Sequence, residues 1–148
     1  MSETQFVYVT YIASTPDKVW TALTDADVSA HYWSYSIQSD WKAGSPWRLV
    51  RADKNAKLAN LGEVMESTPP TRLVLTWADP ATPLDKSRVT FTVEPVADMV
   101  RLTVTHDRLQ LGSVMFAGIA DGWPRVFSSL KTYLETGRPL DARAGKAA

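Results

Sequence analysis

A single long amphipathic segment near the end of the chain constrains the fold more than any other feature. Its apolar residues recur at spacings of three and four, which places them in one broad stripe on a helix. The segment follows seven strand-like runs, so we expect the helix to cover one face of a curved antiparallel sheet and to leave a cavity between them. The stripe consists of Phe116, Ile119, Trp123, Val126, Phe127, Leu130, Tyr133 and Leu134.

The first half of this helix is weaker than the second. Pro124 lacks a backbone donor and would clash with the preceding turn, so we expect a kink or a restart near Gly122 and Trp123. Gly118 and Gly122 lower the helix propensity of the same turns. We therefore expect the cavity to open along residues 118–124 and the sounder second half to clamp the core.

Ahead of the helix, the sequence predicts a strand, a split helix and six further strands. Thr15 before Pro16 is typical of a helix N-cap, and Asp25 and Asp27 indicate a break between two short helical pieces. The first strand covers residues 6–12, and its register stays open because two alternating apolar sets compete for the inner face. The later strands are expected at residues 35–41, 47–52, 62–67, 73–77, 88–96 and 99–106.

Three of the later strands alternate clearly enough to assign their faces, because successive side chains of a strand point to opposite sides. His106 is then the one polar member of the inner set. The side chains expected to face inward are Leu73, Leu75, Trp77, Val89, Phe91, Val93, Leu102, Val104 and His106.

The length and composition indicate one domain. With 148 residues, of which 45% are hydrophobic, the chain can bury a sizeable core. We expect a single domain over residues 1–140 and a frayed tail over residues 141–148.

Charge and cysteine content exclude several function classes. Sixteen basic and sixteen acidic residues cancel, so no net charge attracts nucleic acid or a membrane surface. The absence of cysteine excludes disulfides and thiolate chemistry and favours the cytoplasm, as does the lack of an export signal or spanning segment. His31 and His106 lie far apart without spaced carboxylates, so no metal is expected, and no cofactor motif is present.

Four distinctive stretches follow one another in the chain: residues 12–20 (IASTPDKVW), Gly62-Glu63-Val64 ahead of Pro69-Pro70, residues 73–77 (LVLTW) and Gly122-Trp123-Pro124. Together they resemble the bacterial relatives of the C-terminal domain of the heat-shock ATPase activator, the AHSA-type proteins of the START and birch-pollen-allergen-like (SRPBCC) superfamily. The resemblance spans about residues 6–138.

The resemblance implies an α+β helix-grip fold: a curved antiparallel sheet of about seven strands wrapped around a long C-terminal helix, with two short helices after the first strand. It also implies a deep pocket between sheet and helix. Members of the superfamily range from lipid carriers to cyclases and co-chaperone modules, and fold alone does not choose among these functions. Related proteins are often dimers, so a homodimer is a further expectation.

Six tryptophans are the compositional oddity, and aromatic walls with a few polar groups are typical of sites for apolar ligands. Regular apolar patterns favour core packing for Trp20 and Trp77. For Trp33, Trp41, Trp47 and Trp123, packing and pocket lining stay open as alternatives. The residues predicted to line the ligand site are Trp33, Tyr35, Trp47, Met65, Trp77, Phe91, His106, Met115, Ile119 and Trp123.

His106 is the only candidate catalytic group, and two interpretations stay open. If it faces the cavity, it donates a hydrogen bond to a ligand or acts as a general base. If it lies in the core, it is a structural histidine bonded to a backbone carbonyl, which we favour. Asp107 does not help catalysis, because adjacent strand residues point to opposite faces.

The leading hypothesis is the non-catalytic binding of a small hydrophobic or aromatic molecule. The alternatives are a chaperone-associated interaction module and a cyclase-like or hydrolase-like enzyme that uses His106. The eukaryotic activator has an additional N-terminal domain that makes much of its chaperone contact, whereas this chain begins at the first strand, which favours ligand binding.

Overall fold

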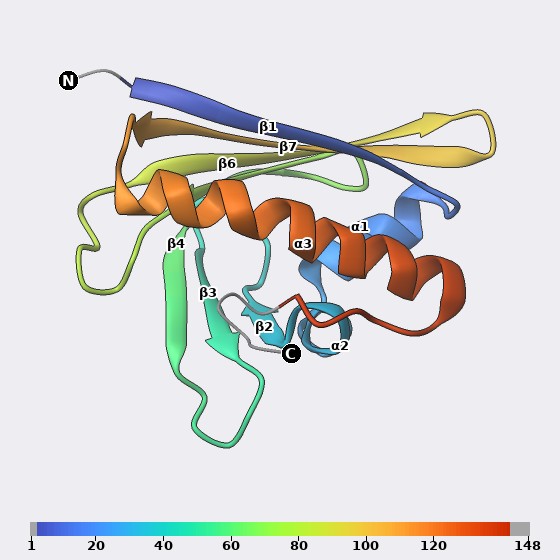
Figure 1. Cartoon of the computed structure of the whole chain (residues 1–148), viewed down its shortest axis with the longest axis horizontal. Coiled ribbons are helices and arrows are strands. Elements are labelled where there is room, and N and C mark those ends of the chain that lie inside the picture. Colours follow the sequence, from blue (N-terminus) through green and yellow to red (C-terminus); the bar gives the residue numbers. More distant parts are fainter. Residues whose placement is uncertain (1–2, 143–148) are drawn as a thin grey trace.

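The chain folds into a curved antiparallel sheet with a long helix lying across its inner face (Figure 1). The computed structural model describes residues 3–142. Within that range the elements follow one another as β1 (Glu3–Ile12), α1 (Pro16–Thr24), α2 (Ala26–Trp33), β2 (Tyr35–Gln38), β3 (Pro46–Arg51), β4 (Leu58–Thr68), β5 (Arg72–Trp77), β6 (Ser87–Val96), β7 (Met99–Gln110) and α3 (Val114–Thr136). The predicted helix-grip architecture is confirmed.

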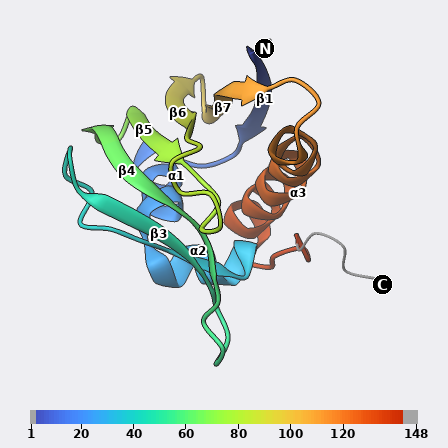
Figure 2. The same ribbon diagram turned by 90° about the vertical axis from the view of Figure 1, so that its left-hand side faces the viewer.

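The sheet has the strand order β1-β7-β6-β5-β4-β3-β2, and every neighbouring pair is antiparallel. The first two strands of the chain therefore form its two edges. Figure 2 shows the strands arching around α3, which lies on their inner side. This arch leaves the space between sheet and helix to be filled by side chains from both.

The expected split of the first helical region is confirmed. The Thr15 hydroxyl accepts a hydrogen bond from the backbone N–H of Lys18 and caps α1. Asp25 ends α1 and caps α2, because its carboxylate accepts from the N–H groups of Asp27 (2.9 Å) and Val28 (3.0 Å).

The sequence left open which face of β1 is buried, and in the structure the even-numbered residues face inward. Phe6 and Tyr8 pack against the core, whereas Val7, Val9 and Tyr11 point outward with 43–47% of their surface exposed. Tyr8 meets Phe127 of α3 edge to face, with ring centroids 6.1 Å apart. The helix therefore selects which face of β1 is buried.

Several strand ends differ from the predictions. β2 ends at Gln38 rather than residue 41, and the left-handed backbone of Trp41 (φ 63°) lies in the loop after it. β7 continues to Gln110 because a bulge at Asp107 and Arg108 (φ 58°) takes up the register shift against β1. This extension carries Gln110 to the end of the sheet where α3 begins.

Helix α3 runs unbroken from Val114 to Thr136, so a restart of the helix near Gly122 and Trp123, one of the two predicted alternatives, is wrong. The lost backbone hydrogen bond costs roughly 3 kcal/mol. Burial of Trp123, Val126 and Phe127 on either side contributes more, at about 1.5–3 kcal/mol each. Tertiary packing therefore holds the helix continuous through its proline.

The second half of α3 is fastened to the edge of β1. Lys131 Nζ donates to the carbonyl of Tyr11 (2.6 Å), and Glu135 accepts from the N–H of Ala13 (2.8 Å). Lys131 and Glu135 also pair with each other at 2.7 Å. These bonds satisfy backbone groups at the edge of the sheet, and they confirm that this half of the helix acts as a clamp.

The first part of the predicted tail is held against the rest of the domain. Ala142 is buried, and its carbonyl accepts a hydrogen bond from Arg125 Nη1 (2.8 Å). Leu140 donates its N–H to the Ser129 hydroxyl (3.0 Å). The domain therefore reaches at least Ala142 rather than ending at residue 140, and residues 143–148 of the expected tail lie outside the described residues.

Gly62 allows β4 to approach β5 closely. A Cβ at this position would lie 2.0 Å from the carbonyl oxygen of Thr76, which also accepts the indole N–H of Trp47. A Cβ at Gly122 in α3 would meet nothing within 4 Å. The two glycines therefore have opposite structural roles.

We predict that Gly62→Ala lowers the free energy of unfolding by about 2–4 kcal/mol, because backbone must move to admit the methyl group. The matched change Gly122→Ala should raise it by up to about 1 kcal/mol, because alanine is the better helix former. Urea denaturation measures both. Equal effects of the two changes would contradict the role assigned to Gly62.

Candidate functional site

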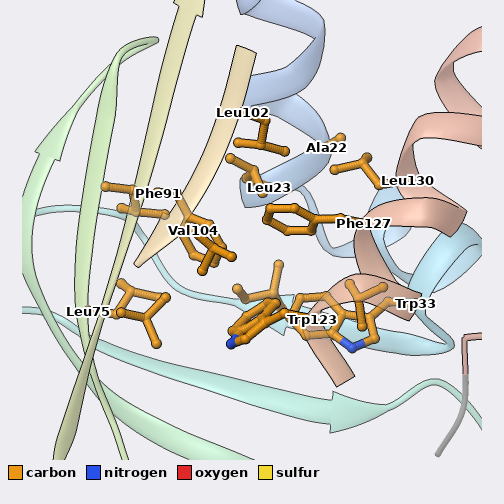
Figure 3. Packing of buried hydrophobic residues seen from close by; sticks show 14 of the residues in the cluster. Ala22, Leu23, Trp33, Leu75, Phe91, Leu102, Val104, Trp123, Phe127 and Leu130 are labelled. Carbon is orange, nitrogen blue, oxygen red and sulfur yellow. The ribbon is translucent and has the colours of Figure 1, made fainter. Parts of the chain in front are cut away.

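Aromatic side chains fill the middle of the space between the sheet and α3. The ring of Trp123 lies within 5.3–5.7 Å, centroid to centroid, of Trp33, Trp77, Phe91 and Phe127. Figure 3 shows Trp123 and Phe127 projecting from α3 toward Phe91 and Val104 of the sheet. Where the sequence predicted one cavity, the structure has a packed aromatic centre.

Three buried polar groups cross this centre in a chain of hydrogen bonds. The indole Nε1–H of Trp123 donates to His106 Nδ1 (3.1 Å). His106 Nε2 lies 2.7 Å from Ser87 Oγ, and Ser87 Oγ donates to the carbonyl of Trp77 (2.9 Å). Because Nδ1 accepts, the proton of the neutral ring belongs on Nε2, which then donates to Ser87. We call Trp123, His106 and Ser87 the polar relay.

The relay decides between the two interpretations of His106. The predicted backbone carbonyl partner is wrong, because the ring bonds to a hydroxyl and an indole instead. Both ring nitrogens are occupied, and burial lowers the pKa of His106 to about 4. The histidine is therefore neutral at pH 7 and has no nitrogen free to take a proton from a substrate.

Asp107 points away from the relay, as predicted. Its carboxylate pairs with Arg88 on the other face of the sheet, with Arg88 Nε 2.9 Å from Oδ1. This bond to Arg88 lowers the pKa of the Asp107 carboxyl below its usual range.

A hollow of about 580 Å³ lies beyond the aromatic centre, at the N-terminal end of α3. Its walls come from β4, β5, the end of β7, the first turns of α3 and the loop between β5 and β6, which Figure 1 shows beside the start of α3. The lining residues are Ala59, Asn60, Trp77, Asp79, Ala81, Thr82, Asp85, Ser87, Arg108, Leu109, Gln110, Ser113, Val114, Met115, Gly118 and Ile119. We call this space the larger hollow.

A smaller hollow of about 170 Å³ adjoins it along α3. Ala59, Asn60, Trp77, Gly118 and Ile119 line both spaces. The smaller hollow is further lined by Trp33, Tyr35, Leu49, Gly122, Trp123, Arg125, Val126 and Ala142. Both hollows therefore follow the glycine-containing half of the helix.

The structure brings six of the ten predicted site residues to the walls of the hollows: Trp33, Tyr35, Trp77, Met115, Ile119 and Trp123. Trp47, Phe91 and His106 lie in the core and line neither hollow. Met65 is 53% exposed and also lines neither, because Val64 occupies the inward position of β4.

Several polar residues of the larger hollow were missed by the sequence analysis. Asp79 and Asp85 belong to an irregular loop without periodicity, and Gln110 lies just beyond the predicted end of β7. The glycines of α3 were the one usable signal, since Gly118 lines both spaces.

Across residues 3–142, no cluster of three or more histidine or acidic side chains is placed to hold a metal ion. In the same range, no helix has the length and apolar character needed to cross a membrane.

The chain matches the sequence model of one known protein family. The sequence model of a family described as "Activator of Hsp90 ATPase homolog 1-like protein" matches residues 13–135. No curated protein matches the chain.

Solved structures share the fold at low sequence identity. Aha1 from Colwellia psychrerythraea, solved as a dimer, is 22% identical, with 90% of this chain and 98% of that chain covered and a TM-score of 0.77. An HSP90 activator from Plasmodium falciparum is 22% identical over 87% of this chain and 92% of that chain, with a TM-score of 0.71. CalU16 from Micromonospora echinospora is 19% identical over 90% of this chain and 77% of that chain, with a TM-score of 0.73.

The polar relay predicts a pH dependence of stability. His106 has a pKa of about 4 in the folded protein and 6.5 when unfolded, so the unfolded state binds more protons between these values. The stabilisation is complete above about pH 6.5 and declines as the pH falls toward 4. Between about pH 7.5 and pH 5 the free energy of unfolding should fall by about 2 kcal/mol, measured in urea.

The matched variants separate the two histidines. His106→Gln should remove most of this slope, whereas His31→Gln should keep it, because His31 is on the exposed surface of α2. A slope that survives His106→Gln would show that other groups cause it.

Proposed function

The chain belongs to the family of Activator of Hsp90 ATPase homolog 1-like proteins, and we propose that it binds a small hydrophobic or aromatic molecule between its sheet and α3. The observation that carries this proposal is the larger hollow. Its volume of about 580 Å³ lies within the range of roughly 300–1,000 Å³ common for small-molecule sites.

The walls of the hollow suit an apolar body. Trp77, Leu109, Met115 and Ile119 supply aromatic and aliphatic surface. Gly118 presents no side chain, and a Cβ built there would meet nothing within 4 Å, so a ligand can lie directly against the helix. Eight of the sixteen lining residues are polar, and three of these, Asp79, Thr82 and Asp85, belong to the loop between β5 and β6. Polar groups beside an apolar wall are typical of sites that orient a ligand.

We propose binding without catalysis. His106 was the only candidate base, and its two nitrogens are engaged with Trp123 and Ser87 in the core. A cytoplasmic location, expected from the absence of cysteine, belongs to the same proposal.

Gly118→Leu tests the proposal, because Gly118 lines both hollows and a leucine side chain there would occupy part of their space. We predict that aromatic probes such as indole and naphthalene raise the melting temperature and quench tryptophan fluorescence, and that Gly118→Leu weakens their binding by about tenfold or more. Leucine is a better helix former than glycine, so stability should not fall.

Ala117→Leu is the matched control, because Ala117 is exposed on α3 and lines neither hollow. It should bind the probes as the unchanged protein does. A panel of apolar probes that alters neither fluorescence nor melting temperature would overturn the proposal.

Contact with a chaperone is the second candidate function. Large apolar side chains are strongly exposed where α3 begins: Val114 (91%), Leu111 (66%) and Leu84 (89%) in the nearby loop. Exposed apolar groups of this kind are typical of protein contact surfaces. The similar protein from Plasmodium falciparum is an HSP90 activator, which supports testing the same role here.

If this candidate is correct, the protein should stimulate the ATPase of a purified Hsp90-type chaperone, and Val114→Lys should reduce the stimulation. Met65→Lys is the control, since Met65 is an exposed apolar residue elsewhere on the sheet. An ATPase rate that does not respond to the unchanged protein would exclude the candidate.

Self-association is a separate proposal. β1 is an edge strand whose outward residues Val7, Val9 and Tyr11 are partly exposed, and a similar Aha1 is a dimer. Sedimentation of this chain as a monomer at micromolar concentration would exclude it.

A further inference from the structure

One polar side chain lies where the two hollows meet. Five residues line both spaces, and we call the place that they surround the junction: Ala59, Asn60, Trp77, Gly118 and Ile119. We propose that the ligand is a neutral aromatic molecule with a hydroxyl group, and that Asn60 selects it by accepting a hydrogen bond from that hydroxyl. This inference rests on the proposed function and names the ligand class for the same site.

The register of β4 directs Asn60 toward α3. Asn60 pairs with Leu49 of β3, a buried residue that also lines the smaller hollow. Paired residues of neighbouring strands point to the same face of a sheet, so Asn60 lies on the inner face. The next pair joins Val50 to Leu58, which leaves Ala59 as the extra residue of a bulge. Asn60 is therefore a polar residue on a face that is otherwise mostly apolar.

One hydrogen bond fixes the orientation of the Asn60 amide. Its Nδ2 donates to the carbonyl oxygen of Ala78 (3.2 Å). A carbonyl oxygen only accepts, so the amide nitrogen belongs on the side of Ala78 and the amide oxygen on the other side. The position of Oδ1 therefore follows from the partner of Nδ2.

The Oδ1 atom of Asn60 has no donor. Within residues 3–142 it accepts no hydrogen bond. The one fully buried side-chain nitrogen or oxygen in this range that lacks a partner is Oε1 of Gln110, so the unpaired Oδ1 of Asn60 keeps accessible surface. Because Asn60 lines both hollows, a ligand in the junction can donate a hydrogen bond to this oxygen.

Trp77 supplies a donor at the same junction. Its indole Nε1–H has no acceptor within residues 3–142 and is not fully buried either. Trp77 is only 4% exposed, so the accessible surface of its side chain faces the hollows that it lines. A hydroxyl group matches both junction atoms, because it donates to an acceptor and accepts from a donor.

The smaller hollow favours a neutral ligand. Among its described lining residues Arg125 alone is charged, and the guanidinium already donates to the Asp121 carboxylate (2.8 Å) and to the carbonyl of Ala142 (2.8 Å). A charged ligand would lose its hydration there without gaining a free counter-ion.

The walls also favour an aromatic body. Trp33 and Trp123 line the smaller hollow beside the junction, with their ring centroids 5.7 Å apart (Figure 3). The hollow of about 170 Å³ has room for a ring, since an apolar cavity of about 150 Å³ binds benzene. With the ring in the smaller hollow and the hydroxyl at Asn60, the rest of the ligand extends into the larger hollow.

Three probes with one ring system test the inference: 2-naphthol, 2-methoxynaphthalene and 2-naphthoate. Calorimetry with the full chain at neutral pH gives each dissociation constant. We expect 2-naphthol to bind about threefold to tenfold more tightly than 2-methoxynaphthalene, which cannot donate a hydrogen bond, and about tenfold or more tightly than the anionic 2-naphthoate. Binding of 2-naphthol no tighter than that of either other probe would overturn this inference and keep the proposed function. No binding of any probe, naphthalene included, would overturn both.

Asn60→Leu locates the effect. The Ala78 carbonyl keeps the hydrogen bond from the N–H of Leu61 (3.1 Å) in this variant, so the melting temperature should stay close to that of the unchanged protein. The preference for 2-naphthol over 2-methoxynaphthalene should disappear. A lower melting temperature with the preference unchanged would show a structural role instead and overturn the assignment of Asn60.

Two further variants serve as controls. Asn55→Leu changes an exposed asparagine of the loop between β3 and β4 that lines neither hollow, and it should keep the preference. Tyr35→Phe removes a hydroxyl of the smaller hollow that has no hydrogen-bond partner within residues 3–142, and it should keep the preference as well. A preference that is lost in Tyr35→Phe and kept in Asn60→Leu would contradict the role assigned to Asn60.

Discussion

The hydrogen bond from Trp123 to His106 is the constraint on which the arrangement of this protein depends. It ties the middle of α3 to β7, and the bond from His106 to Ser87 continues the tie to β6. The groups are buried, so each must keep its partner or lose the free energy of an unpaired polar group. Trp123 also contacts four other aromatic rings, so polar and apolar packing hold the helix at one height above the sheet.

The attachment of the middle of α3 to the sheet explains where the two hollows lie. The C-terminal half of α3 is bound to the edge of β1 through Lys131 and Glu135, and the middle is filled by aromatic side chains. Only the N-terminal half has glycine where larger side chains would reach the sheet. The hollows therefore lie along Gly118 and Gly122, between the packed centre and the loop that joins β5 to β6.

His106 has a structural role in the core, whereas Ser87 and Trp123 of the polar relay also line the two hollows. The family and the shared fold leave the function open, because one fold can serve carriers, co-chaperones and enzymes. The volume of the larger hollow, about 580 Å³, and its apolar wall of Trp77 and Ile119 are what support the proposed binding of a small molecule at this end.

Sequence alone determined the order of the elements and the faces of β5, β6, β7 and α3. The period of two in β5, β6 and β7 and the period near 3.6 in α3 report burial directly, because each residue's own polarity decides which side faces water. Tertiary structure decided how the buried sides meet. Ser87, His106 and Trp123 are far apart in the chain and come together only through the β6–β7 register and the height of α3. Whether tryptophans fill or line a space depends on how closely two surfaces approach, and no local pattern encodes that distance.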